Sequence, residues 1–184
     1  MATRTKHHPA DDVLLARYQR GDMDALALLV QRYKTALMNF IAQFIGSIEV
    51  ATPLLRDTLL QAVQQAPNLA HDTGFAFVAF RIARSLCLEH LETRRTTDGG
   101  ELAASVGVTN VPGLQDPALA QLAQVPHNLR DVLLLREVGG LDFEEIARIV
   151  GDSDQAVKVR LRAALEHLWI EAQDISVTQQ KEIS

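Results

Sequence analysis

The chain has little of what disulfide-rich, membrane-spanning or β-sheet proteins are built from. Its 184 residues include one cysteine, one tryptophan and only 5% aromatic residues. A single thiol cannot form an internal disulfide, and no apolar run reaches the roughly 20 residues of a membrane span. The first residues, MATRTKHH, lack the apolar core of a signal peptide. We therefore expect a cytoplasmic protein that makes no membrane contact.

Sequence patterns for catalysis and metal binding are also missing. The six histidines are scattered along the chain. Two of them, His7 and His8, lie in a start that we expect to be disordered over residues 1–9. No paired metal spacing, nucleophile elbow or phosphate-binding glycine loop is present. We expect no metal, no cofactor and no enzymatic activity, and we interpret Cys87, among leucines on a helix, as a buried structural thiol.

What the chain does have is helical periodicity, with 47% hydrophobic residues and no long strand-like alternation. This predicts an all-α protein of two small helical domains. Residues 10–95 form the first, with breaks at Gly21, at Gly46-Ser47 and from Pro67 to Gly74, which gives about four helices. Turn-forming residues predict a flexible linker over residues 96–116 and a second domain over 117–173. The tail, residues 174–184, loses the apolar stripe, and we expect it to fray.

The second domain has the pattern of a helix-turn-helix, which places a helix in the DNA major groove. Asp142 can cap a helix that begins at Phe143 and ends before Gly151, and Ser153 can cap the next helix. The next helix has an apolar stripe, which we expect to be buried: Val157, Leu161, Ala164, Leu165 and Leu168. Its outward basic residues are Lys158, Arg160 and Arg162. We expect Trp169 to pack beneath this helix.

Two stretches carry a resemblance to a known family. PHNLRDVLLLREVGGL (residues 126–141) and FEEIA (143–147), extended by Val157-Lys158 and Arg160-Leu161, closely resemble region 4 of bacterial sigma factors. GDMDAL (21–26) through Tyr33, and FRIARS (80–85) through Leu91, resemble region 2 of the same family. The chain is therefore similar to extracytoplasmic-function (ECF) sigma factors of the sigma-70 family, which keep only these two domains.

The resemblance implies that the chain recruits core RNA polymerase, through its β′ clamp helices and β flap, to promoter DNA. It assigns the −10 element to region 2 and the −35 element to region 4. The candidate −10 contacts are Asn68, His71, Arg81 and Arg84. The candidate −35 contacts are Ser153, Asp154, Gln155, Lys158, Arg160 and Arg162. Net charge is −5, and residues 126–170 hold six basic against eight acidic residues, so we expect weak binding to free DNA.

One departure from the family lies at residues 50–53. Aligned backwards from Pro67, this tetrapeptide falls where the family usually has the acidic run Asp-Ala-Glu-Asp, whose carboxylates face the basic clamp helices. The candidate polymerase-binding residues here are Val50, Ala51, Thr52, Pro53, Arg56 and Asp57. Complementary charge speeds encounter and fixes register, so we expect the unmodified chain to be a poor sigma factor.

Thr52 offers a way to restore the missing charge. Pro53 is favoured at the first position of a helix, here expected over residues 54–66, which predicts Thr52 as its N-cap. A phosphate on Thr52 would then face the positive end of that helix. We hypothesise activation by a Ser/Thr kinase, and the resemblance extends to a subgroup that lacks the acidic motif and is paired with such kinases. In the other interpretation Thr52 is an ordinary cap in a degenerate paralogue. Rival phosphorylation sites are Thr58, Thr96 and Thr97.

Other functions compete with this interpretation. A helix-turn-helix transcription regulator would share the C-terminal pattern, but residues 81–84 have no place in a receiver or ligand domain. A degenerate sigma-like module that sequesters a kinase or an anti-sigma factor would fit the acidic balance and the missing motif. In vitro transcription separates such a module from a working sigma factor.

Overall fold

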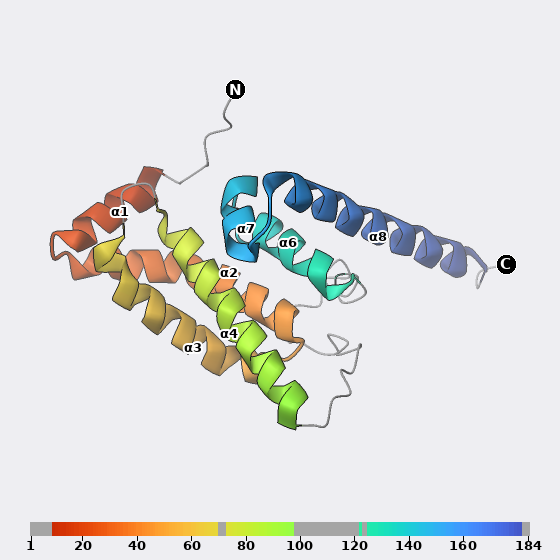
Figure 1. Cartoon of the computed structure of the whole chain (residues 1–184), viewed down its shortest axis with the longest axis horizontal. Helices are drawn as coiled ribbons and strands as arrows, with labels where there is room; N and C mark the ends of the chain where they lie inside the picture. The colour runs from red at the N-terminus through yellow and green to blue at the C-terminus, as the bar shows by residue number, and fades with distance from the viewer. Residues whose placement is uncertain (1–8, 70–72, 98–121, 123–124, 182–184) are drawn as a thin grey trace.

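The structure is a computed structural model that describes residues 9–69, 73–97, 122 and 125–181. All regular structure in these residues is helical, which confirms the predicted fold class. Figure 1 shows α1 to α4 as one bundle, with α6, α7 and α8 along one side of it. None of the described helices is both long and apolar enough to span a membrane. The predicted disordered start, up to residue 8, and the predicted linker from residue 98 lie outside the described residues.

Four α-helices and one 3-10 turn form the N-terminal bundle. They are α1 (Pro9–Gln19), α2 (Met23–Ile45), α3 (Ile48–Gln65), η1 (Ala66–Asn68) and α4 (Phe75–Thr97). Asp22 caps α2 by accepting hydrogen bonds from the N–H groups of Asp24 and Ala25. Gly46 ends the helix with a φ of 80°, a conformation that glycine adopts at little steric cost. The helix breaks fall where the sequence predicts them.

Three helices form the C-terminal part: α6 (His127–Glu137), α7 (Phe143–Val150) and α8 (Asp154–Lys181). Asp142 and Glu145 form a capping box, in which each side chain accepts a hydrogen bond from the other residue's N–H, at 2.8 and 3.0 Å. Gly151 ends α7 with a φ of 74°. Ser153 Oγ accepts a hydrogen bond from the N–H of Ala156 at 3.2 Å and so caps α8. The predicted helix-turn-helix is therefore present, with the predicted caps.

One hydrophobic core joins the two groups of helices. Phe40 of α2 and Phe80 of α4 are fully buried and pack edge to face, with ring centroids 5.4 Å apart. The same cluster of buried side chains includes Leu134 of α6 and Ile146 of α7. A smaller cluster lies at α6 and α8 and contains Val125, Leu133 and Ala164. The C-terminal helices are thus docked on the N-terminal bundle.

The predicted start of the third helix was wrong. α3 begins at Ile48, and Ser47 is its N-cap, accepting a hydrogen bond from the N–H of Val50 at 3.4 Å. Thr52 therefore lies one turn inside α3, and Pro53 lies within the helix rather than at its first position. Ser47 follows Gly46 directly and offers an earlier cap, and this cap sets the start of α3 although Pro53 then removes one backbone hydrogen bond inside the helix.

The predictions for the end of the chain were also wrong in part. Trp169 is 69% exposed and Leu165 is 50% exposed, so neither packs as expected. The helix does not fray at Asp174, because α8 continues to Lys181. Figure 1 shows the reason for these exposed side chains: α6 and α7 lie beside the first part of α8, and the C-terminal part of α8 extends beyond them. Only Val157 and Ala164 of the predicted stripe are fully buried.

Candidate nucleic-acid and partner interfaces

The start of α8 presents the surface predicted to enter the DNA major groove. Ser153, Asp154 and Gln155 are all exposed there. Lys158 is exposed as well, and its ammonium nitrogen lies 5.3 Å from the centre of the Phe143 ring on α7. This cation–π contact holds the side chain against the turn while the charge stays at the surface.

The second predicted cation of this surface, Arg160, is already paired with an aspartate. Arg160 Nη2 lies 2.6 Å from Asp152 Oδ2, and the two side chains are 34% and 29% exposed. Arg162 is exposed on the same helix. The three basic residues therefore do not act as one unit, because Asp152 compensates the charge of Arg160.

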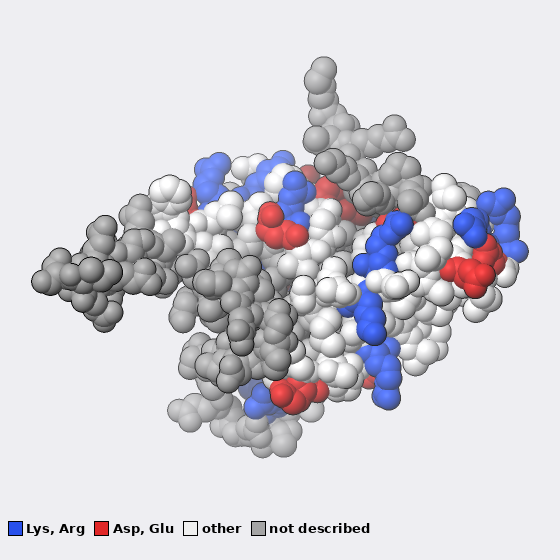
Figure 2. All heavy atoms as spheres, turned by 180° about the vertical axis from the view of Figure 1, so that it is seen from behind, with Lys and Arg blue, Asp and Glu red and all other residues white. Residues whose placement is uncertain are grey.

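Basic side chains are scattered on the face of the molecule that Figure 2 shows. In Figure 2, Lys and Arg form separate groups and one narrow line, with broad uncharged surface around them. Affinity for DNA depends on how many phosphates basic side chains neutralise together. The arrangement agrees with the expectation of weak binding to free DNA.

The predicted −10 residues end in different environments. Asn68 is exposed in η1, whereas His71 lies outside the described residues. Arg81 is exposed on α4, where its Nη2 donates to Gln65 Oε1 at 2.9 Å. Its guanidinium carbon also lies 5.7 Å from the centre of the Phe77 ring. Arg81 thus remains at the surface, held by its neighbours on α3 and α4.

Arg84 is turned toward the C-terminal helices instead. Its Nε and Nη2 donate to Asp131 Oδ2 on α6 at 3.1 and 3.0 Å. Its Nη1 lies 3.5 Å from the carbonyl oxygen of Ile149 on α7. The side chains of Arg84 and Asp131 are only 19% and 5% exposed. Sequence reasoning missed Asp131, because the two residues lie 47 positions apart and meet only when the two halves dock.

A groove of about 340 Å³ lies beside this ion pair, at α4 and the end of α7. It is lined by Arg81, Arg84, Ser85, Leu88, Glu89, Glu92 and Ile149. Both predicted −10 arginines therefore line one groove, together with one residue of the C-terminal part.

The candidate polymerase surface on α3 is only partly available. Ala51 is fully buried and Val50 packs against the core, so these two predicted contacts do not face a partner. Thr52 is exposed, and its hydroxyl donates to the carbonyl oxygen of Ile48 at 2.9 Å. Pro53 is also exposed. A partner can therefore reach Thr52 and Pro53 on this face of α3. It cannot contact all four residues of the predicted tetrapeptide.

Two charged residues complete this surface. The side chains of Arg56 and Asp57 are 82% and 47% exposed, and Arg56 Nε lies 3.4 Å from Asp57 Oδ1. Among the rival threonines, Thr58 is fully buried and Thr96 is exposed. The side chain of Thr97 lies outside the described residues. Burial removes Thr58 from the candidates for modification.

The lone thiol has the structural role that the sequence predicts. Cys87 is buried, and burial raises its pKa to about 12, so the thiol stays protonated near neutral pH. Within the described part of the chain, no group of three His, Cys, Asp or Glu side chains is arranged to hold a metal ion.

Comparison with known proteins agrees with both halves of this arrangement. Residues 116–168 match the family described as Sigma-70, region 4. The chain is 28% identical to the RNA polymerase sigma-H factor of Pseudomonas aeruginosa over 174 residues, which cover 85% of the chain and 90% of that protein. It is 26% identical to the ECF RNA polymerase sigma-E factor of Escherichia coli K12 over 174 residues, covering 85% and 91%. The chain is thus similar to ECF-type sigma factors over most of its length.

Solved structures of sigma-factor complexes share the fold. CnrH in complex with the cytosolic domain of CnrY matches with a TM-score of 0.66 and 22% identity, over 90% of this chain and 98% of that one. The sigma factor RpoE of Bartonella quintana, in complex with the anti-sigma factor NepR, matches with a TM-score of 0.65 and 21% identity. That match covers 77% of this chain and 92% of RpoE. The likeness to these two structures is therefore one of fold.

Proposed function

We propose that the chain acts as a sigma factor, a subunit that brings RNA polymerase to promoter DNA. The observation that carries the proposal is the span of the similarity. The sequence match to RNA polymerase sigma factors covers 85% of the chain and includes both groups of helices. A transcription regulator that shared only the helix-turn-helix would match over the C-terminal part alone.

Two surfaces serve promoter recognition in this proposal. The exposed start of α8 reads the −35 element, with Gln155 and Lys158 facing base edges and Arg162 facing phosphate. The −10 strand binds at η1 and α4, where Asn68 and Arg81 are exposed. Weak binding to free DNA is acceptable, because contact with DNA becomes effectively intramolecular once the protein is docked on polymerase.

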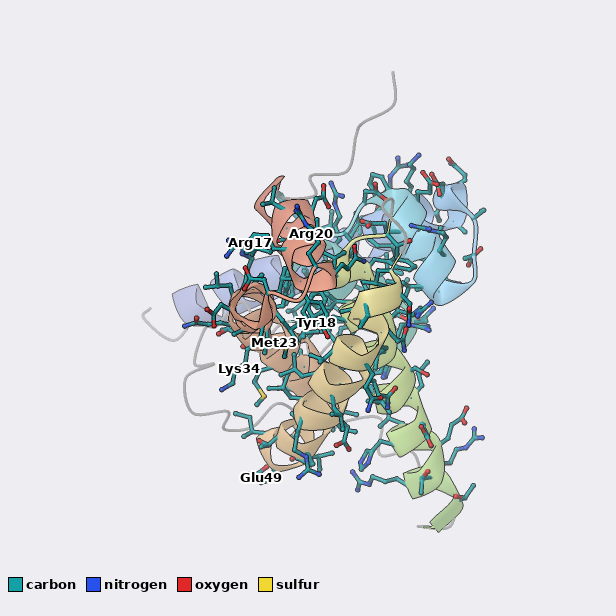
Figure 3. All side chains as sticks on the ribbon, turned by 90° about the vertical axis from the view of Figure 1, so that its left-hand side faces the viewer. Arg17, Tyr18, Arg20, Met23, Lys34 and Glu49 are labelled. Atoms are coloured by element: carbon teal, nitrogen blue, oxygen red, sulfur yellow. The ribbon has the colours of Figure 1, made fainter. Side chains whose placement is uncertain are left out.

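The polymerase surface on α3 carries a single free negative charge among its described residues. Asp57 is compensated by Arg56, which leaves Glu49 as the free carboxylate, and its backbone hydrogen bond together with the hydrogen bond from the hydroxyl of Ser47 at 2.8 Å lowers its pKa and keeps it ionised. Figure 3 shows Glu49 at one end of the bundle, far from Arg17 and Arg20 at the other end. A partner surface that is basic therefore finds little complementary charge at the start of α3.

Phosphorylation of Thr52 by a Ser/Thr kinase supplies that charge. A phosphate adds about −1.5 to −2 charges at neutral pH. The exposed hydroxyl of Thr52 supports this step. The helix dipole no longer contributes as first expected, because Thr52 lies one turn inside α3 and the effect fades after the first turn. The proposal now depends on surface charge alone.

Pro53 makes Thr52 easier to reach. Proline has no N–H, so the helix bond that residue 53 would donate to the carbonyl of Glu49 is missing. Modification also requires the Thr52 hydroxyl to leave the carbonyl of Ile48. A first turn that lacks one backbone bond opens locally at lower free energy than an intact one.

Binding of core polymerase tests the kinase step. The protein would be compared unmodified, phosphorylated by a co-expressed kinase, and as the variants Thr52→Ala and Thr52→Glu. Two added charges at ~0.2–1 kcal/mol each predict an affinity gain between about twofold and about thirtyfold. Thr52→Ala should abolish the gain from the kinase, and Thr52→Glu should reproduce part of it.

Thr93→Glu is the matched control. Thr93 is an exposed threonine on α4, and its hydroxyl also donates to a carbonyl one turn earlier, that of Glu89, at 2.8 Å. It should leave polymerase binding unchanged. Tight binding by the unmodified protein, equal to that of the phosphorylated form, would contradict the kinase step.

A sigma-like interaction module that holds an anti-sigma factor or a kinase is the second candidate. The docked arrangement of the two halves favours it, because Arg84 is paired with Asp131 and is not free to contact DNA. In vitro transcription with phosphorylated protein and core polymerase decides between the two. A transcript that starts at a specific promoter supports the sigma factor. The absence of any specific transcript supports the interaction module.

A further inference from the structure

We propose that the C-terminal helices compete with the −10 DNA strand for one surface of α4, so that the free protein holds itself closed. The inference depends on the proposed role of α4 in promoter binding. It concerns regulation of that same surface and names the occupant, which is the chain's own α6 and α7.

The first support is the direction of the Arg84 guanidinium. Its Nε and Nη2 are bound by Asp131 of α6, and its Nη1 faces the carbonyl of Ile149 at the end of α7. All three nitrogens are therefore directed at C-terminal helices. An arginine held in this way cannot donate to a DNA phosphate, so DNA and the C-terminal helices exclude each other at this position.

The second support is that Asp131 is satisfied on one side only. Asp131 Oδ2 accepts both hydrogen bonds from Arg84, whereas its buried Oδ1 accepts none from a described residue. A buried ion pair stabilises a structure well only when its remaining lone pairs are also bonded. This pair therefore suits a contact that opens when a competing ligand takes Arg84.

The third support is a second contact between the same helices. Arg148 of α7 lies over the ring of Phe77 on α4, 4.4 Å from its centre. Arg81, the other predicted −10 arginine, lies 5.7 Å from the same ring. The docked α7 thus stands beside both arginines that the −10 strand would use.

The C-terminal helices also contact α2 but leave the start of α8 exposed. The ring of His127, at the start of α6, meets the ring of Phe44 edge to face at 4.5 Å. Gln155 and Lys158 stay exposed at the start of α8. The closed protein therefore keeps its −35 surface free, while Arg84 of its −10 surface is engaged by α6 and α7.

Two substitutions at the contact, with one control, test the competition. Asp131→Asn removes the acceptor charge, and Arg148→Gln removes the cation over Phe77. Glu137→Gln removes one negative charge from an exposed position of the same α6 and should change nothing. The probe is a single-stranded −10-type oligonucleotide binding to the full, unmodified chain.

Each substitution should strengthen binding to the oligonucleotide. If closed molecules exceed open ones about tenfold, opening raises the apparent affinity about tenfold, and we expect this from Asp131→Asn. Arg148→Gln is the sharper test, because the loss of a cation alone should weaken DNA binding. Competition predicts the opposite, a gain of about threefold from a partial shift of the same equilibrium.

The distance between the two halves gives a readout that does not involve DNA. Leu60→Cys on α3 and Glu166→Cys on α8 place spin labels at exposed positions in the two halves. The native Cys87 is buried and should stay unlabelled. We expect one short distance in the parent protein and a longer, broader distribution after Asp131→Asn.

The outcomes separate this inference from the proposed function. Longer distances together with tighter oligonucleotide binding support the competition. Unchanged distances and unchanged binding in both variants overturn it, and leave the sigma-factor proposal standing. Longer distances without any gain in binding overturn the competition by showing that α4 does not hold the −10 strand. If Asp131→Asn fails to fold, as judged by circular dichroism, Arg148→Gln at its exposed position decides.

Discussion

The surface of α4 and the surface of α8 each hold an arginine paired with an aspartate, but the two pairs do different things. Arg84 and Asp131 join helices from the two halves and are 19% and 5% exposed. Arg160 and Asp152 lie eight positions apart, at the start of α8, and are 34% and 29% exposed. The same chemistry thus closes one surface and only adjusts local charge on the other. Burial, and the number of elements that each pair joins, make the difference.

The largest test of this comparison removes one aromatic side chain from each region. Phe80→Ala on α4 should lower the free energy of unfolding by about 3–5 kcal/mol, because it leaves a cavity at a fully buried position. Trp169→Ala on α8 should change it by less than about 0.5 kcal/mol, because Trp169 is 69% exposed. Urea unfolding followed by circular dichroism measures both. A large loss from Trp169→Ala would show that α8 is not open as described.

Replacing the aspartate of each ion pair should have a smaller effect on the free energy of unfolding, and it compares the two pairs directly. Breaking a trapped buried pair usually costs about 3–5 kcal/mol. Asp131→Asn should cost less, about 1.5 kcal/mol, because the protein can open and let Arg84 reach water, as a tenfold excess of closed molecules implies. Asp152→Asn should cost under about 1 kcal/mol, as for other exposed pairs. Equal losses in urea unfolding would remove the distinction between the two surfaces.

The smallest effect concerns pH. Burial against the neighbouring helices lowers the pKa of His127 below its usual 6.5. Its neutral form is therefore favoured in the docked state, and that contribution is fully present above the unfolded pKa and is lost as the pH falls through the lowered pKa. The charged groups acting on it are Arg84 of α4 and Arg130 and Asp131 of α6.

We expect the distance between the halves to lengthen slightly as the pH falls from about 7.5 to about 5. Spin-label distances at the two pH values check this. His127→Gln should remove most of the response. A response of unchanged size in that variant would assign the pH dependence to another group.

Local signals made much of the fold predictable. Asp142, Gly151 and Ser153 each act within one helical turn, so residue type and spacing were enough to place the turn between α7 and α8. The helix breaks of the N-terminal bundle were predictable for the same reason. The buried Cys87 followed from its apolar neighbours.

The errors came from features that depend on tertiary structure or on competing local signals. Ser47 and Pro53 both mark helix starts, and the sequence does not say which one wins. The exposure of Trp169 depends on how far α6 and α7 extend along α8. The contact of Arg84 with Asp131 depends on docking of the two halves, which no local pattern records. The sequence therefore supplied candidate residues for the site, but it did not predict how they are arranged or which of them, such as Ala51, are buried.

The exposed indole on α8 has a practical consequence. Trp169 is the single tryptophan of the chain and is 69% exposed on α8, the helix whose first residues we propose to contact DNA. Its ultraviolet emission therefore comes from one known position and responds to whatever covers it. Titration of the unlabelled protein with nucleic acid or polymerase can be followed by the colour and intensity of that emission, without attaching any dye.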